Sequence, residues 1–413
     1  MSDEHIPEPN DHKKLGRELE LFTFSDAVGK GLPLWLPKGA TVRRELERWI
    51  VDEEMRRGYQ HVVTPDIAKL DLYRKSGHYP HYKDSMYAPI VIDDEEFMLR
   101  PMTCPHHFEL YLSKPHSYRE LPMRIAELAK LYRYEQSGEL MGLQRVRSFC
   151  LADAHIICAS EEQAVEEIGR ALDLIEYAAS VFGLAYGADY HYRLSLGDRA
   201  NTEKYFKNDA AWKKGEALLR QLMRDRGAEF VEGKDEAAFY GPKIDVQMKN
   251  VNGKEDTAFT VQYDFCMPER FDLTYVGSDG NKHRAFVVHR SSIGAIERIV
   301  AFLIEKYAGA FPLWLAPVQV NVLPVSEKHH EYANLLLDML SKAGIRAEGD
   351  LTSETLGKRI RAAKQQKVPY TLIVGDEEVK NETATLEGRS GEKEVLPLSE
   401  IILRLKAEIE SRA

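Results

Sequence analysis

The stretch 99–111, LRPMTCPHHFELY, holds three side chains that could bind a transition metal. Cys104 precedes Pro105, and His106 and His107 follow directly. A cysteine in this setting can be a nucleophile, a metal ligand or a buried thiol. Proline favours the first turn of a helix, where the helix dipole and a bound cation would both favour the Cys104 thiolate. The stretch alone leaves open which of the three side chains binds a metal.

A second stretch, 131–155, is dense in arginine for an apolar, strand-like region. Arg133 lies before the glycine-punctuated turn SGELMG, and Arg145 and Arg147 lie after it. Arginines on two strands of a hairpin can clamp a phosphate, because the planar guanidinium pairs with oxyanions through two hydrogen bonds. A salt-bridged surface hairpin would have the same sequence pattern.

A third stretch, 287–303, VVHRSSIGAIERIVAFL, predicts a helix that Gly294 opens, with Arg298 in its first turns. A helix start beside an arginine can hold a phosphate. An ordinary core helix with a solvated arginine is the alternative, and the stretch by itself favours that alternative.

The composition limits the setting of these residues. The chain has 413 residues, too many for one ordinary core, with 44% apolar and 30% charged residues, as in a soluble globular protein of two or more domains. No apolar run is long enough to cross a bilayer, and the polar first residues lack the apolar core of a signal peptide. Four cysteines without a CxxC pair indicate a reducing, cytoplasmic compartment. The net charge of −10 argues against a surface uniformly coated for nucleic acid but leaves room for local basic patches.

The periodicity up to residue 312 predicts strands with helices around them. Apolar residues at helical spacing predict a helix over 40–57, which Gly58 ends. Two further helices are predicted over 160–182 and 294–309. The predicted strands are 59–65, 95–100, 123–135, 145–158, 243–249, 256–265 and 284–290. Because few crossover helices separate these strands, a largely antiparallel sheet is expected.

The pattern changes near 312–317. From residue 318 the chain alternates strand and helix through strands at 318–325, 345–350 and 370–375, and ends in a helix at 398–412. This alternation predicts an independent α/β unit of about 100 residues.

Several segments, taken together, resemble one family. The segment TPDI resembles class II motif 1, YRYE with Arg145 and RVRSF resembles motif 2, and IGAIERIVAFL resembles motif 3. The segments LRPMTCPHHFELY, DAHIIC, AFYGPKIDV, TVQYDF and HRSSIGAIER are similar to those of threonyl-tRNA synthetases in order and spacing. From about residue 11 to its end, the chain therefore resembles a class IIa aminoacyl-tRNA synthetase of the threonyl family.

The resemblance implies an ATP site with Mg²⁺ accompanying the nucleotide. Arg133 would bridge the amino-acid carboxylate and the α-phosphate, where a cation between two anions lowers the barrier to their reaction. Glu135 would read the adenine amino group, and Arg145 would meet the β- and γ-phosphates. Phe149 and Arg298 would sandwich the adenine ring. Lys243 would hold a phosphate or the substrate anion.

The resemblance also implies a zinc site made of Cys104, His155 and His289. Three protein ligands leave open positions that the amino and hydroxyl groups of threonine can fill. Valine lacks the hydroxyl, and a site that requires a hydroxyl rejects such an isostere far better than an apolar pocket does. The same pocket is expected to contain Asp153, Tyr240, Gln262 and Met102. His106 and His107 are not expected to bind the metal.

The remaining cysteines and some departures from the family pattern need their own interpretation. Cys150, Cys158 and Cys266 are predicted to be buried thiols in apolar strands. The chain has His106 where glycine is usual, Thr103 where asparagine is usual, Leu151 for a frequent glutamine and Ala295 for a frequent serine. Leu151 is expected to alter contacts to the amine of threonine.

The C-terminal unit resembles a class IIa anticodon-binding domain. Lys358, Arg361 and Lys364 recur at helical spacing and could contact phosphates, although a solvated basic helix would have the same spacing. Glu378 matches a family glutamate that reads an anticodon base. Glu387 stands where arginine is common.

The whole prediction is an α+β protein: an N-terminal tail and lead-in helix at 1–30, a class II catalytic domain at 31–312, and an α/β anticodon-binding domain at 313–413. It is expected to act in the cytoplasm as a homodimeric threonine–tRNA ligase that forms threonyl-adenylate and charges the 3′ end of tRNA(Thr), with neither DNA nor a membrane as partner.

The chain is expected to lack the N-terminal editing region of many bacterial relatives. Serine is only one methyl smaller than threonine, worth roughly 1–3 kcal/mol. Some serine misacylation is therefore expected, with correction by a separate trans-editing protein or by a region outside this sequence.

Two rival functions remain. A prolyl or seryl specificity is disfavoured by the set of Cys104, His155 and His289. A non-catalytic, RNA-binding paralogue is disfavoured by the intact Arg133, Glu135 and Arg298.

Overall fold

The computed structural model describes residues 10–412, which form two compact units. The larger unit comprises 24–33 and 47–301, and the smaller one comprises 34–46, 302–412 and the described residues up to 23. The start of the predicted tail, 1–9, lies outside the described residues. The predicted lead-in helix is α1 (His12–Glu18), whose N-cap Asp11 accepts a hydrogen bond from the Lys13 backbone N–H at 2.7 Å. The predicted domain boundaries at 30 and 312 stay predictions.

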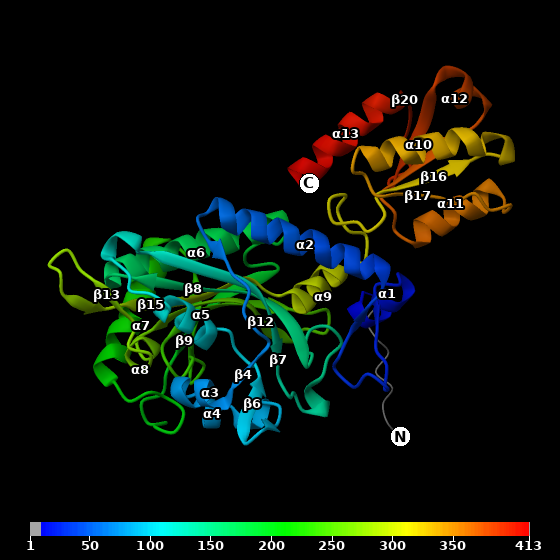
Figure 1. Cartoon of the computed structure of the whole chain (residues 1–413). Helices are drawn as coiled ribbons and strands as arrows, with labels where there is room; N and C mark the ends of the chain where they lie inside the picture. The colour runs from blue at the N-terminus through cyan, green and yellow to red at the C-terminus, as the bar shows by residue number, and fades with distance from the viewer. Residues whose placement is uncertain (1–9, 413) are drawn as a thin grey trace. The chain divides into compact units, whose positions relative to one another are not determined.

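An eight-stranded sheet organises the larger unit (Figure 1). Its spatial order is β10-β9-β11-β12-β15-β8-β7-β3. All neighbours are antiparallel except the two outermost pairs, β10–β9 and β3–β7, which are parallel. The strands are β3 (Gln60–His61), β7 (Met123–Tyr132), β8 (Ser148–Cys158), β9 (Tyr190–Leu196), β10 (Phe230–Lys234), β11 (Lys243–Lys249), β12 (Glu255–Asp264) and β15 (Phe286–Ala295). The prediction of an α+β architecture with a largely antiparallel sheet is confirmed.

The helix α6 (Glu161–Val181) lies across this sheet and contacts β8, β12 and β15 (Figure 1). Ser160 caps its start by accepting from the Gln163 backbone N–H at 3.2 Å, and Glu161 and Glu162 lie in its first turn, where the helix dipole favours negative charge. Its apolar side chains recur on one face and are buried, which accounts for the helix predicted over 160–182.

Shorter elements complete the larger unit. Its other helices are α3 (Leu70–Ser76), α4 (His78–His81), α5 (Cys104–Leu112), α7 (Asp209–Asp225) and α8 (Met267–Arg270), with turns η1 (Lys83–Ser85), η2 (Tyr118–Glu120) and η3 (Ser137–Glu139). Its other strands form a three-stranded sheet of β4 (Ile67–Lys69), β6 (Glu95–Leu99) and β5 (Ile90–Ile92), and a hairpin of β13 (Thr274–Val276) and β14 (Lys282–Arg284). Two helices, α2 (Pro37–Arg56) and α9 (Ile296–Lys306), contribute residues to both units.

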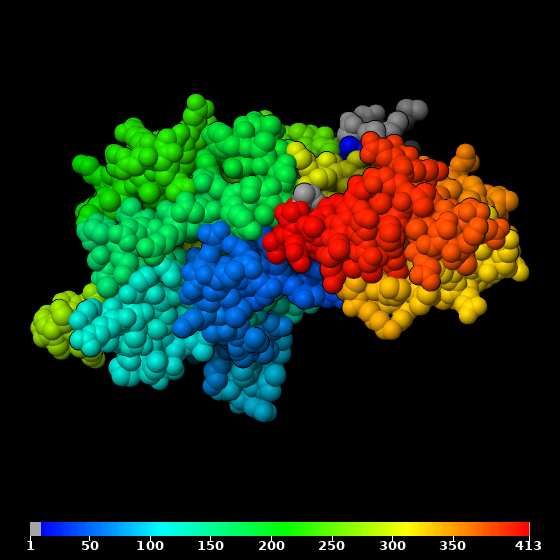
Figure 2. All heavy atoms as spheres, turned by 90° about the horizontal axis from the view of Figure 1, so that it is seen from above, coloured from blue at the N-terminus to red at the C-terminus, as the bar shows by residue number. Residues whose placement is uncertain are grey.

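The smaller unit contains a second, five-stranded sheet with the order β17-β16-β18-β19-β20. The three strands β17, β16 and β18 are parallel, and β19 and β20 add antiparallel. The elements are β16 (Val320–Pro324), η4 (Glu327–His329), α10 (His330–Lys342), β17 (Ala347–Gly349), α11 (Leu356–Gln365), β18 (Tyr370–Val374), α12 (Asp376–Asn381), β19 (Thr383–Gly388), β20 (Lys393–Pro397) and α13 (Leu398–Ser411), with β1 (Phe22–Thr23) and β2 (Leu34–Trp35) also in this unit. In space-filling view its C-terminal residues, yellow to red, form a continuous packed body (Figure 2). The predicted alternation of strand and helix is confirmed.

Three local predictions were wrong. The strand predicted over 59–65 is much shorter, because β3 comprises Gln60 and His61 and Val62 adds one backbone hydrogen bond to Ala126 of β7. Gly294 does not open a helix, because β15 continues to Ala295 through a register shift after Ser291, and Gly294 adopts φ +67° inside it; a bulge with a left-handed residue favours glycine. Cys266 lies directly before α8 and not in a strand.

Candidate active site

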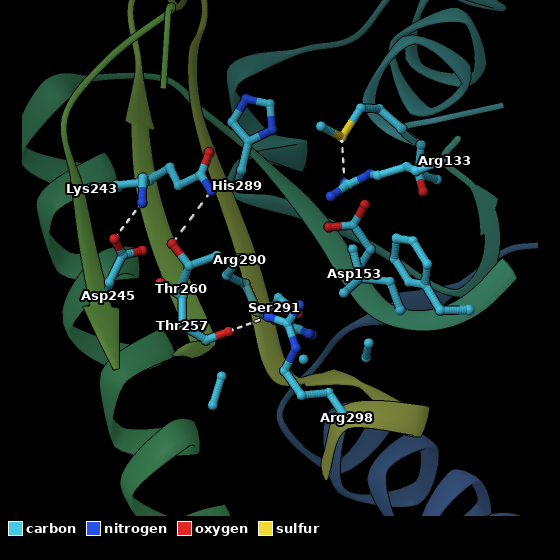
Figure 3. A pocket seen from close by; sticks show the side chains of 18 of the residues that line it. Arg133, Asp153, Lys243, Asp245, Thr257, Thr260, His289, Arg290, Ser291 and Arg298 are labelled. Atoms are coloured by element: carbon cyan, nitrogen blue, oxygen red, sulfur yellow. Dashed lines mark hydrogen bonds and ion pairs between the residues drawn. The ribbon is translucent and has the colours of Figure 1, made fainter. Parts of the chain in front are cut away.

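A cavity of about 300 Å³ opens over the sheet of the larger unit, at the lower end of the size range of ligand sites. Strands β8, β11, β12 and β15 contribute to its wall, as do the starts of α5 and α9. In the close view, Arg133 and Asp153 lie on one side and Lys243 and Asp245 on the other, with residues of β15 between them (Figure 3). Among the predicted residues, those that line the cavity are Met102, Cys104, Arg133, Glu135, Arg145, Phe149, Asp153, His155, Tyr240, Lys243, Gln262, His289 and Arg298.

Cys104, His155 and His289 converge in this cavity. The two histidines are opposite one another in the β8–β15 pairing, with ring centroids 4.6 Å apart. Cys104 is the first residue of α5, as the proline in its first turn predicts. One potential ligand atom from each residue lies within 4.8 Å of the other two, and all three side chains are buried. Tetrahedral zinc holds such atoms about 3.3–3.6 Å apart, so small side-chain movements suffice and the donor set fits zinc.

The second ring nitrogen of His289 supports that fit. His289 Nε2 lies 2.6 Å from Asp264 Oδ2, while Asp264 Oδ1 accepts from the backbone N–H groups of Cys266 and Met267. A carboxylate of this kind orients an imidazole and fixes its tautomer. Because Nε2 carries the proton of the hydrogen bond that it donates to Asp264, Nδ1 is the nitrogen with a free lone pair for a metal.

Cys104 behaves differently from the expectation based on its helix position. Burial raises the pKa of its thiol well above the ordinary value, and the carboxylates of Asp153 and Asp264 add to that effect. The helix dipole therefore does not produce a thiolate by itself. A bound cation is needed to deprotonate this sulfur, as metal coordination does.

Arg133 and Arg298 carry positive charge into the cavity. The Arg133 guanidinium donates to Met102 Sδ at 3.2 Å (Figure 3) and lies 5.0 Å from the Phe149 ring centre. Arg298 donates to the carbonyls of Gln144, at 3.0 Å, and Thr257. Burial lowers the pKa of both guanidinium groups. Desolvated cations in one cavity favour an anionic ligand.

Some charged residues of the arginine-rich hairpin line the cavity, and others lie outside it. Glu135 and Arg145 line the cavity, and Arg145 lies 3.7 Å from Glu139. Arg147 instead donates to the Glu135 carbonyl at 2.9 Å and lies over the Tyr134 ring. Arg145 therefore has the ion pair that the surface alternative expects, whereas Arg147 contacts a backbone carbonyl and an aromatic ring.

The opposite wall holds polar groups with fixed orientations. Tyr240 stacks on His289 with ring centroids 4.7 Å apart and donates to Gln262. Lys243 forms an ion pair with the buried Asp245 (Figure 3). On the Arg133 side of the cavity, burial raises the pKa of Asp153 (Figure 3).

Other predicted residues lie away from the cavity. Lys358, Arg361 and Lys364 are exposed on α11, with Lys358 and Lys364 in ion pairs with Glu354 and Glu387. Glu378 accepts from Thr385 Oγ1 at 2.7 Å and from the Gly375 backbone N–H at 2.9 Å. Cys150, Cys158 and Cys266 are buried free thiols, as predicted.

Sequence reasoning missed His78. It is fully buried at the start of α4, and its Nε2 lies 3.8 Å from Cys104 Sγ. Burial lowers the pKa of His78 to about 3. No spacing relative to the other ligating residues marks this histidine, because α4 reaches the site only through the tertiary fold.

Comparisons with known proteins identify the family of this chain. A model of the tRNA synthetase class II core domain (G, H, P, S and T) matches residues 87–307, and an anticodon-binding domain model matches 319–408. Threonine–tRNA ligases of Geobacillus sp. (strain WCH70) and Listeria monocytogenes serovar 1/2a are each 51% identical over 97% of this chain. The chain spans 62% of the length of these two curated relatives.

Two solved structures of the threonyl-tRNA synthetase family are similar to this chain. A structure described as the RNA binding domain of threonyl-tRNA synthetase from Cryptosporidium parvum Iowa II superposes with a TM-score of 0.91 at 34% identity, covering 96% of this chain and 98% of that one. A putative threonyl-tRNA synthetase from Aeropyrum pernix gives a TM-score of 0.84 at 27% identity, covering 98% of this chain and 97% of that one. The chain therefore belongs to the class II tRNA synthetases and, among them, to the threonyl-tRNA synthetase family.

Proposed function

We propose that this chain is a threonine–tRNA ligase, which activates threonine with ATP and transfers it to the 3′ end of tRNA(Thr). One observation carries the proposal: the Cys104, His155 and His289 group lies in the same cavity as Arg133 and Arg298. The three ligand residues could hold a metal that binds an amino acid. The two arginines in the same cavity could bind the triphosphate of a nucleotide.

Adenylate formation needs two anions to meet. Arg133 would bridge the amino-acid carboxylate and the α-phosphate, and Lys243 would hold the substrate anion from the opposite wall. The two cations neutralise and position the reacting groups. The carboxylate is already ionised, so no side chain needs to act as a general base.

The nucleotide would lie along the arginine-rich wall with Mg²⁺ bound to its phosphates. Glu135 would accept from the adenine amino group, and Arg145 would contact the β- and γ-phosphates. Phe149 and Arg298 would enclose the adenine ring. The Arg133 guanidinium at 5.0 Å from the Phe149 ring would have to share that ring with the base.

Threonine selection would depend on the metal group. Zinc held by Cys104, His155 and His289 would supply open coordination positions for the amino and hydroxyl groups of threonine. Asp153 would accept a hydrogen bond from that hydroxyl, while Tyr240, Gln262 and Met102 would enclose the side chain. Valine would be rejected by about 10⁴–10⁵-fold, as in sites that require a hydroxyl, against about 10²-fold for an apolar pocket.

The smaller unit would bind the anticodon of tRNA(Thr). Lys358 and Arg361 are exposed on α11 and would contact phosphates, Lys358 by exchanging its ion pair with Glu354. Glu378 is engaged within the unit, with Gly375 and Thr385, so reading a base would require it to share or exchange these contacts.

A homodimer and a cytoplasmic site of action complete the proposal. Val63 is 94% exposed directly before Thr64 of the TPDI segment, and Met55 near the end of α2 is 57% exposed. A second copy would cover such apolar surface. No helix in residues 10–412 is both long and apolar enough to span a membrane.

The test is pyrophosphate exchange with single amino acids. The proposal predicts exchange with threonine, weaker exchange with serine, and none above background with valine or proline. Proline-dependent exchange would support the rival specificity. No exchange with any amino acid, in protein that binds tRNA, would support the non-catalytic paralogue.

A further inference from the structure

His107 is inserted between a buried carboxylate and a proposed zinc ligand. His107 Nδ1 lies 2.8 Å from His155 Nδ1, and His107 Nε2 lies 3.2 Å from Glu127 Oε2. His107 and Glu127 are 0% and 3% exposed, and His155 is 1% exposed. The three side chains therefore form a continuous hydrogen-bonded row that water does not reach.

Glu127 is held as an ionised acceptor. Its two oxygens accept from the Thr64 backbone N–H at 3.1 Å, from Thr64 Oγ1 at 2.7 Å and from the Arg100 guanidinium at 3.1 Å. A carboxylate with these donors has no proton to give, so the proton in the contact with His107 must belong to the imidazole.

The positions of the other protons follow. A neutral His107 with its proton on Nε2 has a lone pair on Nδ1, so the proton between the two rings must lie on His155 Nδ1. A neutral His155 then has its lone pair on Nε2. His289 has the complementary arrangement, with a carboxylate in direct contact at Nε2.

We infer that Glu127 and His107 are positioning residues that hold His155 in the tautomer presenting Nε2 to the metal. The inference rests on the zinc site of the proposed function. It distinguishes the two adjacent histidines: His107 orients a ligand, whereas neither ring nitrogen of His106 has a hydrogen-bond partner within residues 10–412. Removing such an outer partner typically weakens metal affinity 10–100-fold.

The test measures zinc affinity by competition with a chromophoric chelator, together with the visible spectrum of the Co²⁺-substituted protein. His107→Leu is expected to weaken zinc binding about 10–100-fold and to change the Co²⁺ spectrum. His107→Gln is expected to restore most of the affinity, because its carbonyl can accept from His155 and its amide can donate to Glu127. His106→Leu is the matched control, since it removes a buried imidazole from the same helix and should leave zinc affinity unchanged.

Two outcomes would overturn the inference. One is a His107→Leu protein that binds zinc as tightly as His106→Leu. The other is a His107→Gln protein as weak as His107→Leu, since hydrogen bonding would then not explain the loss. An unmodified protein that activates threonine without binding zinc would instead refute the zinc part of the proposed function.

Discussion

Gly294 gives a quantitative test of how the sheet positions the cavity. It has φ +67°, and a Cβ added there would lie 2.0 Å from the Ala258 carbonyl oxygen on β12. Gly294→Ala therefore has to move one strand by about 1 Å. The left-handed backbone costs about 1–2 kcal/mol and the overpacking about 1–3 kcal/mol. The expected loss in the free energy of unfolding is about 2–5 kcal/mol.

The same shift should weaken ATP binding, because Arg298 follows in α9 and donates to the carbonyl of Thr257, the neighbour of Ala258. Gly253→Ala is the matched control, with φ +76°. Apart from its chain neighbours, no atom of the described residues lies within 4 Å of the added Cβ, so only the backbone cost remains. Urea unfolding followed by tryptophan fluorescence gives the stabilities, and calorimetric titration gives the ATP affinity. Equal losses in the two variants, with unchanged ATP affinity, would refute the reasoning.

Three other predictions concern buried charge. Glu54→Gln should destabilise the chain by about 3–5 kcal/mol in urea unfolding, because Arg290, 2.6 Å from Glu54, would keep a buried charge without its partner. Arg133→Lys should lower threonine-dependent pyrophosphate exchange about 10²–10³-fold, since the ammonium cannot bridge two anions as the guanidinium does. The pKa of Glu127 is about 2, lowered from 4.5 by hydrogen bonds from His107 and Thr64 and by the Arg100 charge, against the opposing effect of burial. It therefore contributes stability above pH 4.5 that is lost as the pH falls toward 2, worth about 3 kcal/mol. Thermal unfolding from pH 6 to pH 2.5 should show the gap between the unmodified protein and Glu127→Gln narrowing.

Local sequence patterns predicted several of the regular elements well. The strand 243–249 is confirmed residue for residue as β11, and the helix 160–182 differs from α6 only at its ends. By contrast, α7 was not predicted although it is strongly amphipathic. The parallel strands β9 and β10 were not predicted either, because their pairing joins distant segments.

The sequence could indicate which residue types form the site, but not how the fold brings them together. His155 and His289 become neighbours only through the β8–β15 register, in which they are direct partners. Sequence patterns carry no information about cross-strand register at that range, so their convergence with Cys104 rested on the family resemblance. The contacts that bring Glu127, Asp264 and His78 to the site join different elements and have no local signature.

The most direct test of the central claim is threonine-dependent pyrophosphate exchange before and after removal of bound metal. The account predicts that chelation abolishes exchange and that added Zn²⁺ restores it in the unmodified protein and in Cys158→Ala, but not in Cys104→Ala. Full exchange by metal-free protein, or by Cys104→Ala without added metal, would contradict it.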